Sequence, residues 1–210
     1  MGDLAEKYAK EREPLEVVRE SYPEKDRVYK KYSEKKMSVS SDNFILSFKD
    51  NTPTLSGREL LIKNIETTLA LKLMFSNSSP LYTELYQNGY INDTFSCDTL
   101  NGEGYSAIMI GGEAKDVKKT ADKILEGIKK VKETGFKTED FERAKKSAFG
   151  RQIRAFNSIE AVANGFCANF FSGINLFDFI EAFDCISCES VHKRVFEIFG
   201  ENNSLSVIKS

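Results

Sequence analysis

Histidine is nearly absent from this chain of 210 residues, which contains only His192. A catalytic zinc site needs about three protein ligands and one open position. Glu189 lies three residues before His192, so a helix would carry both side chains on one face. Two candidate ligands do not complete a site, and we expect these residues to form a surface ion pair. The sequence therefore predicts no metal ligands in this chain.

Cysteine is also scarce, with four residues in total. Cys185 and Cys188 have the C-x-x-C spacing of half a zinc site or of a redox pair. The sequence offers no second close cysteine pair and no histidine pair that would complete a zinc site. We expect reduced thiols in a packed helical region, and the role of the pair stays open.

Long apolar runs are missing, since no stretch reaches the roughly 20 residues that cross a bilayer. The first residues are charged and lack an apolar signal core, so we expect a cytoplasmic protein that does not contact a membrane. The net charge of −2 is too balanced for nucleic acid to be a main partner. A basic band on one predicted helix has no interleaved aromatic platform and is interpreted as a solvated face: Lys145, Lys146, Arg151 and Arg154.

The common motifs of small-molecule enzymes are missing too. Gly111 and Gly112 stand between a predicted strand and a predicted helix, but without the dinucleotide spacing or a Gly-Lys-Ser/Thr ending. They indicate a tight turn. No Gly-x-Ser-x-Gly is present, and no cysteine has an evident histidine partner. The sequence predicts no catalytic residues.

The chain divides into a charged linker or arm, residues 1–35, and a domain, residues 36–210. Alternating and apolar runs predict strands over residues 37–40, 43–49, 94–98, 105–110 and 204–209. The 105–110 strand is expected to be buried on both faces or nearly so. Four-residue and three-residue spacings predict helices over residues 58–76, 81–86, 116–134, 138–156, 159–171, 177–183 and 187–199, with Thr138 and Ser187 as caps. Hairpin-connected strands with segregated helices predict an α+β fold, a two-layer sandwich of a mostly antiparallel sheet with helices on one face.

The stretch over residues 78–97, SSPLYTELYQNGYINDTFSC, is the most informative part of the chain. Leu81 and Leu85 lie four residues apart on a short helix, and Tyr82 and Tyr86 do the same. Gly89 suits the left-handed residue after a helix end. The stretch contains two serines, a leucine followed by an aromatic residue, Glu-Leu, a glycine and a predicted strand, all after a long apolar helix. In this order of features it resembles the C-terminal half of the pitrilysin/insulinase-type zinc metallopeptidases. The likeness to bacterial proteins of the processing-peptidase kind covers residues 36–210.

The resemblance implies a single α+β inactive-half domain over residues 36–210. In that family the zinc ligands come from an inverted His-x-x-Glu-His motif and a downstream Glu. This chain has no such motif, so zinc is expected only in the N-terminal half, and the chain alone is expected to be inactive. Whether the parent protein is an active enzyme stays open.

Active relatives of this type present an Arg and, seven residues later, a Tyr to the substrate. The matching positions here are Tyr86 and either Asp93 or Phe95, so neither residue of that pair is present. The aromatic residues Tyr86, Tyr90 and Phe95 could still form a wall for a peptide. The alternative is that they are packed core aromatics.

The resemblance thus implies a non-catalytic domain that encloses a peptide chamber together with the zinc-bearing half. A peptide would lie extended against a sheet edge, where backbone hydrogen bonds give affinity without reading sequence. The alternative is a purely structural or assembly subunit that pairs with a related peptidase chain and does not contact peptide. The expected partner is the zinc-bearing half or a homologous subunit, and a homodimer of this chain stays open.

Overall fold

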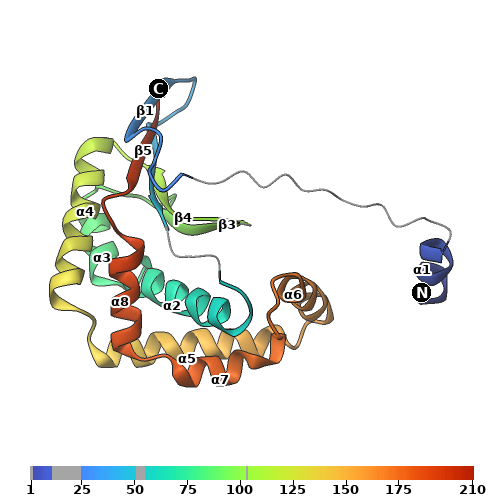
Figure 1. Cartoon of the computed structure of the whole chain (residues 1–210). Helices are drawn as coiled ribbons and strands as arrows, with labels where there is room; N and C mark the ends of the chain where they lie inside the picture. The colour runs from blue at the N-terminus through green and yellow to red at the C-terminus, as the bar shows by residue number, and fades with distance from the viewer. Residues whose placement is uncertain (1, 11–24, 51–54, 103) are drawn as a thin grey trace.

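The described part of the chain forms a five-stranded sheet with helices packed against one face (Figure 1). The computed structural model describes residues 2–10, 25–50, 55–102 and 104–210. The strands are β1 (Tyr32–Lys36), β2 (Asn43–Lys49), β3 (Ser96–Gly102), β4 (Tyr105–Glu113) and β5 (Asn203–Lys209). Their order is β1-β5-β2-β4-β3, with β1 parallel to β5 and all other neighbours antiparallel. The predicted mostly antiparallel sheet is confirmed.

The helical layer accounts for most of the remaining described residues. Its helices are α2 (Gly57–Phe75), α3 (Pro80–Gln87), α4 (Val117–Thr134), α5 (Thr138–Ala155), α6 (Ile159–Phe171), the short 3-10 helix η1 (Leu176–Asp178), α7 (Phe179–Cys185) and α8 (Cys188–Ile198), while α1 (Gly2–Lys10) precedes the sheet. In Figure 1, α2, α4 and α8 cover the same face of the sheet. The α+β prediction is therefore confirmed. No helix of the described residues is long and apolar enough to span a bilayer.

The core lies between the sheet and this helical layer. On β2, Phe44, Leu46 and Phe48 point into the core and are 2% exposed or less, while Ile45 points to the other face and is 45% exposed. This period of two is what a strand with one buried face requires. From the helical side, α2 contributes its buried face, including Leu69, Ala70 and Met74. Each fully buried large apolar side chain stabilises the fold by about 1.5–3 kcal/mol.

Helix ends follow local capping chemistry. Asp116 accepts a hydrogen bond from the Lys119 N–H at 3.1 Å at the start of α4. Ser187 forms a reciprocal capping box with Ser190 at the start of α8, as predicted for Ser187. The predicted cap at Thr138 is wrong, because Thr138 is already the first helical residue of α5 and the extended residue before it is Lys137.

Strand β1 corrects the prediction for the start of the sheet. The sequence predicts a strand over residues 37–40, but the strand is Tyr32–Lys36 and begins inside the predicted arm. All five of its residues are exposed, and it is held by parallel pairing with β5 and by an ion pair of 3.1 Å between Glu34 and Lys209. Hydrophobic periodicity cannot reveal a strand that is polar on both faces. The predicted arm also contains α1, and its residues 11–24 lie outside the described residues.

The predictions for the end and the burial of strand β4 are also wrong. It does not end at Gly111 and Gly112 but continues through them to Glu113. It is also buried on one face only, since Ile108 and Ile110 are 1% and 0% exposed while Met109 between them is partly exposed. A Cβ on Gly111 would lie 2.6 Å from the Phe44 carbonyl oxygen, so glycine is needed for the close approach of β2. These glycines therefore belong to the sheet and not to a turn.

Candidate functional site

The segment over residues 78–97 folds as the predicted corner between a helix and a strand, with the strand beginning at Ser96. Ser79 Oγ accepts a hydrogen bond from the Tyr82 N–H at 3.1 Å and donates one to the Met74 carbonyl at 2.6 Å. These bonds attach the start of α3 to the end of α2. Gly89 follows α3 with φ of +68°, a left-handed conformation that costs glycine little.

Of the three predicted substrate residues, Tyr90 and Phe95 are partly buried and pack against the core, and Phe95 does so through two aromatic contacts. Its ring centroid is 6.3 Å from that of Phe75 and 5.9 Å from that of Tyr82. Aromatic pairs at these separations stabilise a fold beyond the area that they bury. Phe95 therefore has a packing role, whatever else it contacts.

Tyr86 and Tyr90 lie at the rim of the same corner. Tyr86 stacks on Tyr82 with ring centroids 5.7 Å apart and is 44% exposed. A hydrogen bond to Asp93 raises the pKa of the Tyr86 phenol, because the carboxylate accepts the phenolic proton. Tyr90 lies beneath Lys119, whose ammonium is 5.5 Å from the ring centroid. Substrate contact by Tyr86, Tyr90 and Phe95 stays a prediction.

A groove that the sequence did not predict crosses the open face of the sheet. The hollow has a volume of about 820 Å³ and receives residues from all five strands. Its floor includes Ile45, Met109 and the bare backbone of Gly111, and Ser96 and Asp98 contribute polar groups. Ile45, Gly111 and Ser96 share one line across the sheet, because Gly111 is in register with both of the others. The alternation of β2, which turns Ile45 away from the core, is a sequence signal for an open face of the sheet, although it does not locate the groove.

His192 does not form the predicted ion pair. Its Nε2 lies 3.2 Å from the carbonyl oxygens of both Val131 and Lys132, and the described residues include no ion pair between His192 and Glu189. The last carbonyls of a helix lack donors within the helix. The Val131 carbonyl already accepts the Gly135 N–H at 2.8 Å, so the imidazole adds a second contact there and one contact to the Lys132 carbonyl. His192 thereby joins α8 to the end of α4.

The residues that the structure describes contain no cluster of side chains suited to bind a metal ion. Over residues 2–10, 25–50, 55–102 and 104–210, no group of three His, Cys, Asp or Glu residues could hold a metal ion. Cys185 and Cys188 are free thiols. Cys185 accepts a hydrogen bond from Arg58 at 3.6 Å, and Cys188 lies 3.7 Å from the Phe136 carbonyl oxygen. That this chain carries no zinc of its own stays a prediction.

The four thiols are expected to differ in reactivity. Burial raises the pKa of Cys97 to about 12, and burial also raises the pKa of Cys188. Cys167 and Cys185 are exposed. Since the thiolate is the nucleophile, iodoacetamide at about pH 8 should modify Cys167 and Cys185 in the folded 210-residue chain and leave Cys97 unmodified until that chain unfolds. Peptide mass spectrometry measures this, and modification of Cys97 in the folded protein at the rate of Cys167 would contradict it.

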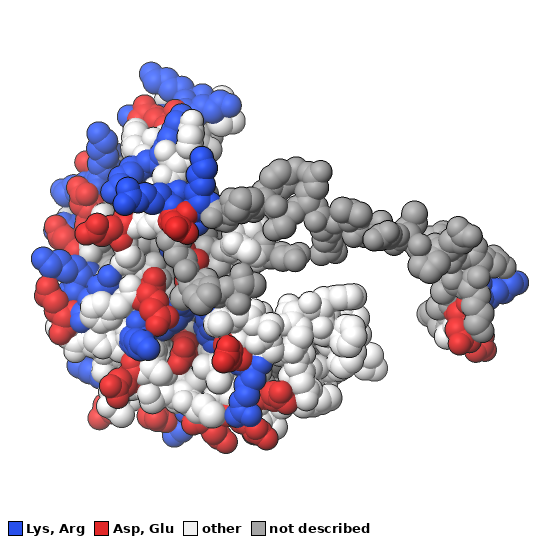
Figure 2. Space-filling view, viewed as in Figure 1, with Lys and Arg blue, Asp and Glu red and all other residues white. Residues whose placement is uncertain are grey.

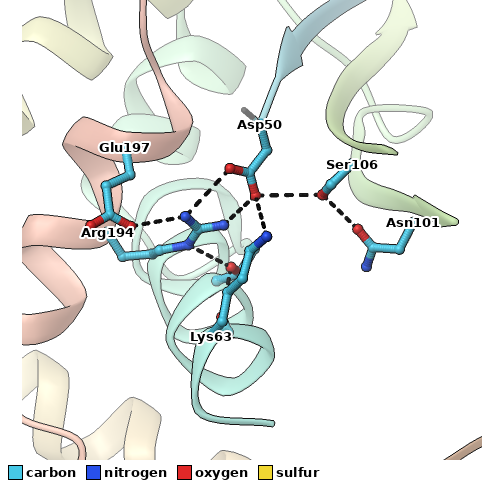
Figure 3. A network of polar contacts seen from close by, with 7 residues as sticks. Asp50, Lys63, Asn101, Ser106, Arg194 and Glu197 are labelled. Atoms are coloured by element: carbon cyan, nitrogen blue, oxygen red, sulfur yellow. Dashed lines mark hydrogen bonds and ion pairs between the residues drawn. The ribbon is translucent and has the colours of Figure 1, made fainter. Parts of the chain in front are cut away.

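A buried polar network joins one end of the sheet to the helices (Figure 3). Arg194 and Asp50 form an ion pair, and their side chains are 2% and 1% exposed. Lys63 Nζ lies 3.2 Å from the same carboxylate, and Arg194 Nε donates to Thr67 Oγ1 at 3.0 Å. Ser106 Oγ contacts the carboxylate at 3.4 Å. The network thus connects β2, α2, α8 and β4, and its burial indicates a structural role.

The comparison with known families decides which family the chain represents. The sequence pattern of a family described as the inactive domain of peptidase M16 matches residues 3–148. The chain belongs to the peptidase M16 family. This confirms the predicted resemblance to the C-terminal, inactive half of an insulinase-type zinc peptidase.

Relatives and solved M16 structures agree with this assignment. A Bacillus subtilis protein described as "Uncharacterized zinc protease YmfH" is 32% identical over 182 residues, which are 87% of this chain and 42% of that protein. The crystal structure of an M16-like peptidase from Alicyclobacillus acidocaldarius is 21% identical and superposes with a TM-score of 0.88 over 98% of this chain and 50% of that one. An inactive peptidase domain from Bordetella parapertussis, 13% identical, has a TM-score of 0.68 over 83% of this chain and 94% of that one. This M16 chain spans half or less of the length of the first two relatives.

Proposed function

We propose that this chain is the non-catalytic C-terminal half of a zinc peptidase, where it forms part of the wall of a peptide-enclosing chamber and of the interface with the zinc-bearing half. The observation that carries the proposal is that the chain matches the M16 inactive-domain family. Its one histidine, His192, contacts two helix carbonyls. Zinc and the hydrolytic chemistry would come from the other half.

The open face of the sheet supports the chamber part of the proposal. The groove of about 820 Å³ presents both apolar and polar side chains, as an extended peptide of varied sequence would require. Its floor includes the apolar side chains of Ile45 and Met109, which a peptide lying across the sheet would contact. Strand β3 lies at the edge of the sheet, where a peptide could add as a further strand through main-chain hydrogen bonds.

The alternative, an assembly subunit without peptide contact, is favoured by one observation. At the positions where active relatives of this type present an Arg and a Tyr, Tyr86 is hydrogen-bonded to Asp93, and Phe95 packs against Phe75 and Tyr82. Side chains held in these contacts leave less surface for a substrate. The two functions differ in whether a bound peptide touches the open face of the sheet.

Substituting Ile45 in the full-length peptidase distinguishes the two functions. Ile45→Lys is expected to raise the KM for peptide cleavage roughly tenfold, because losing one apolar contact costs about 1–3 kcal/mol of binding. Phe196→Lys, at a similarly half-exposed position on α8, is the matched control and should leave KM unchanged. An unchanged KM for Ile45→Lys, with an unchanged melting temperature, would favour the assembly function.

A further inference from the structure

Helix α6 is an apolar helix that the described residues do not cover. Its sequence, IEAVANGFCANFF, has a single charged residue, Glu160, and none of its 13 residues is buried. Ile159, Phe170 and Phe171 are 90%, 65% and 86% exposed. A helix that is apolar on all sides normally lies in a protein interior. The composition of α6 therefore fits a helix that another surface covers.

Three of the exposed phenylalanines of α6 are in contact with one another in a row. We define the α6 patch as Ile159, Phe166, Phe170, Phe171 and Phe177. The Phe166 and Phe170 ring centroids lie 6.1 Å apart, those of Phe170 and Phe171 lie 5.7 Å apart, and Gly165 approaches Leu176 of η1, next to Phe177. Figure 2 shows an uncharged surface over this part of the molecule.

The patch is large enough to form the apolar centre of an interface. Taking about 200 Å² for a whole phenylalanine side chain, its four phenylalanines expose about 500 Å². The largest apolar patch on a typical monomer is about 300–600 Å², and a stable protein interface buries about 800 Å² on each partner. The α6 patch therefore supplies more than half of the area that one side of a standard interface needs.

We propose that the α6 patch is the surface on which this domain docks against the zinc-bearing half of the peptidase. The proposal rests on the function proposed above. The chain spans 42% and 50% of the lengths of two M16 relatives, so a partner of similar size belongs to the same polypeptide there. An apolar, nearly uncharged surface is typical of permanent interfaces, in which the surface is never left in water.

The chemistry of α6 argues against a membrane as the occupant. Helices that lie on membranes carry Lys and Arg on their polar face, and α6 has neither. The partner surface that fits is apolar and poor in charge, because an unpaired charge buried against phenylalanine rings would lose its hydration without compensation.

Two exposed cysteines allow a direct test. Cys167 lies on α6, and Cys185, at the end of α7, is the internal control. Alkylation by iodoacetamide is followed in the full-length peptidase and in this 210-residue chain. We expect Cys167 to react at least about tenfold more slowly in the full-length protein, while Cys185 changes by less than about twofold. Equal rates for Cys167 in the two proteins would overturn the proposal.

Two further measurements identify the surface that covers the α6 patch. Protection by the zinc-bearing half of the same polypeptide is independent of protein concentration, whereas protection that rises with concentration would identify a second copy as the occupant and overturn the proposal. Phe166→Glu should restore Cys167 reactivity in the full-length protein, and Phe196→Glu, which is equally 51% exposed, should not. If the full-length protein cleaves peptide while its Cys167 stays fully reactive, the docking surface is wrong and the proposed function stands.

Discussion

Arg194→Met is expected to lower the free energy of unfolding by about 3–5 kcal/mol, because it removes the buried cation that faces the Asp50 carboxylate. Both side chains are at most 2% exposed, so water cannot replace the lost partner. Lys63, 3.2 Å from the same carboxylate, remains to compensate part of the charge, which favours the lower end of that range. Urea unfolding followed by circular dichroism measures the loss.

A surface ion pair with similar geometry is the control. Arg143 and Asp140 lie 2.6 Å apart, but the Arg143 side chain is 69% exposed. Arg143→Met should therefore cost at most about 1 kcal/mol, because solvent screens exposed pairs. If Arg194→Met costs no more than Arg143→Met, the buried pair does not hold α8 on the sheet.

A double-mutant cycle separates the pair from its surroundings. Asp50→Asn alone leaves Arg194 buried with Glu197 at 2.9 Å and Thr67 at 3.0 Å. The double variant, Asp50→Asn with Arg194→Met, should be less destabilised than the sum of the two single variants, because neither charge of the pair is then left without the other. Additive losses would show that the two side chains stabilise the fold independently.

The isolated 210-residue chain is expected to bind no stoichiometric zinc and to cleave no peptide. A catalytic zinc site needs about three protein ligands, and the chain has one histidine, whose Nε2 contacts two carbonyls of α4. The C-x-x-C pair adds two thiols that lie in hydrogen-bond contact with Arg58 and the Phe136 carbonyl. The control is the longer protein proposed above, in which this chain is joined to a half expected to carry zinc.

The elements that the sequence predicted well are those fixed by local chemistry. Helix α4 begins at Val117, directly after its cap Asp116, and α8 begins directly after Ser187 of its capping box, because a cap and a three-to-four-residue apolar spacing act within a few residues. Strand β1 depends instead on residues about 170 positions away, since it pairs in parallel with β5. Its five exposed residues carry no apolar alternation, so its position could not be read from the local sequence.

The buried network and the candidate site were harder to predict for the same reason. Asp50 stands in a sequence typical of a turn, and only the fold brings it to Arg194. A local signal did exist, because Arg194 lies between Val191 and Val195 on the inward stripe of α8. The groove on the open face needs the register of five strands, which no single stretch encodes.

Helix α6 shows how a correct secondary-structure prediction can leave the environment undetermined. The sequence predicted a helix over residues 159–171, and the structure confirms it at Ile159–Phe171. Its apolar composition would suit a core helix, yet the described residues leave it exposed. Burial depends on which surfaces are present, and a partner surface is not encoded in the helix itself.

The zinc content of the purified 210-residue chain tests most directly the claim that this chain supplies no metal ligands and that zinc binds in the other half. The chain is saturated with zinc, dialysed and analysed for metal by mass spectrometry beside the full-length peptidase. We expect zinc to stay with the full-length protein and to be lost from this chain, since its ligands are too few. One zinc per chain that resists dialysis would contradict a role limited to shape and contact.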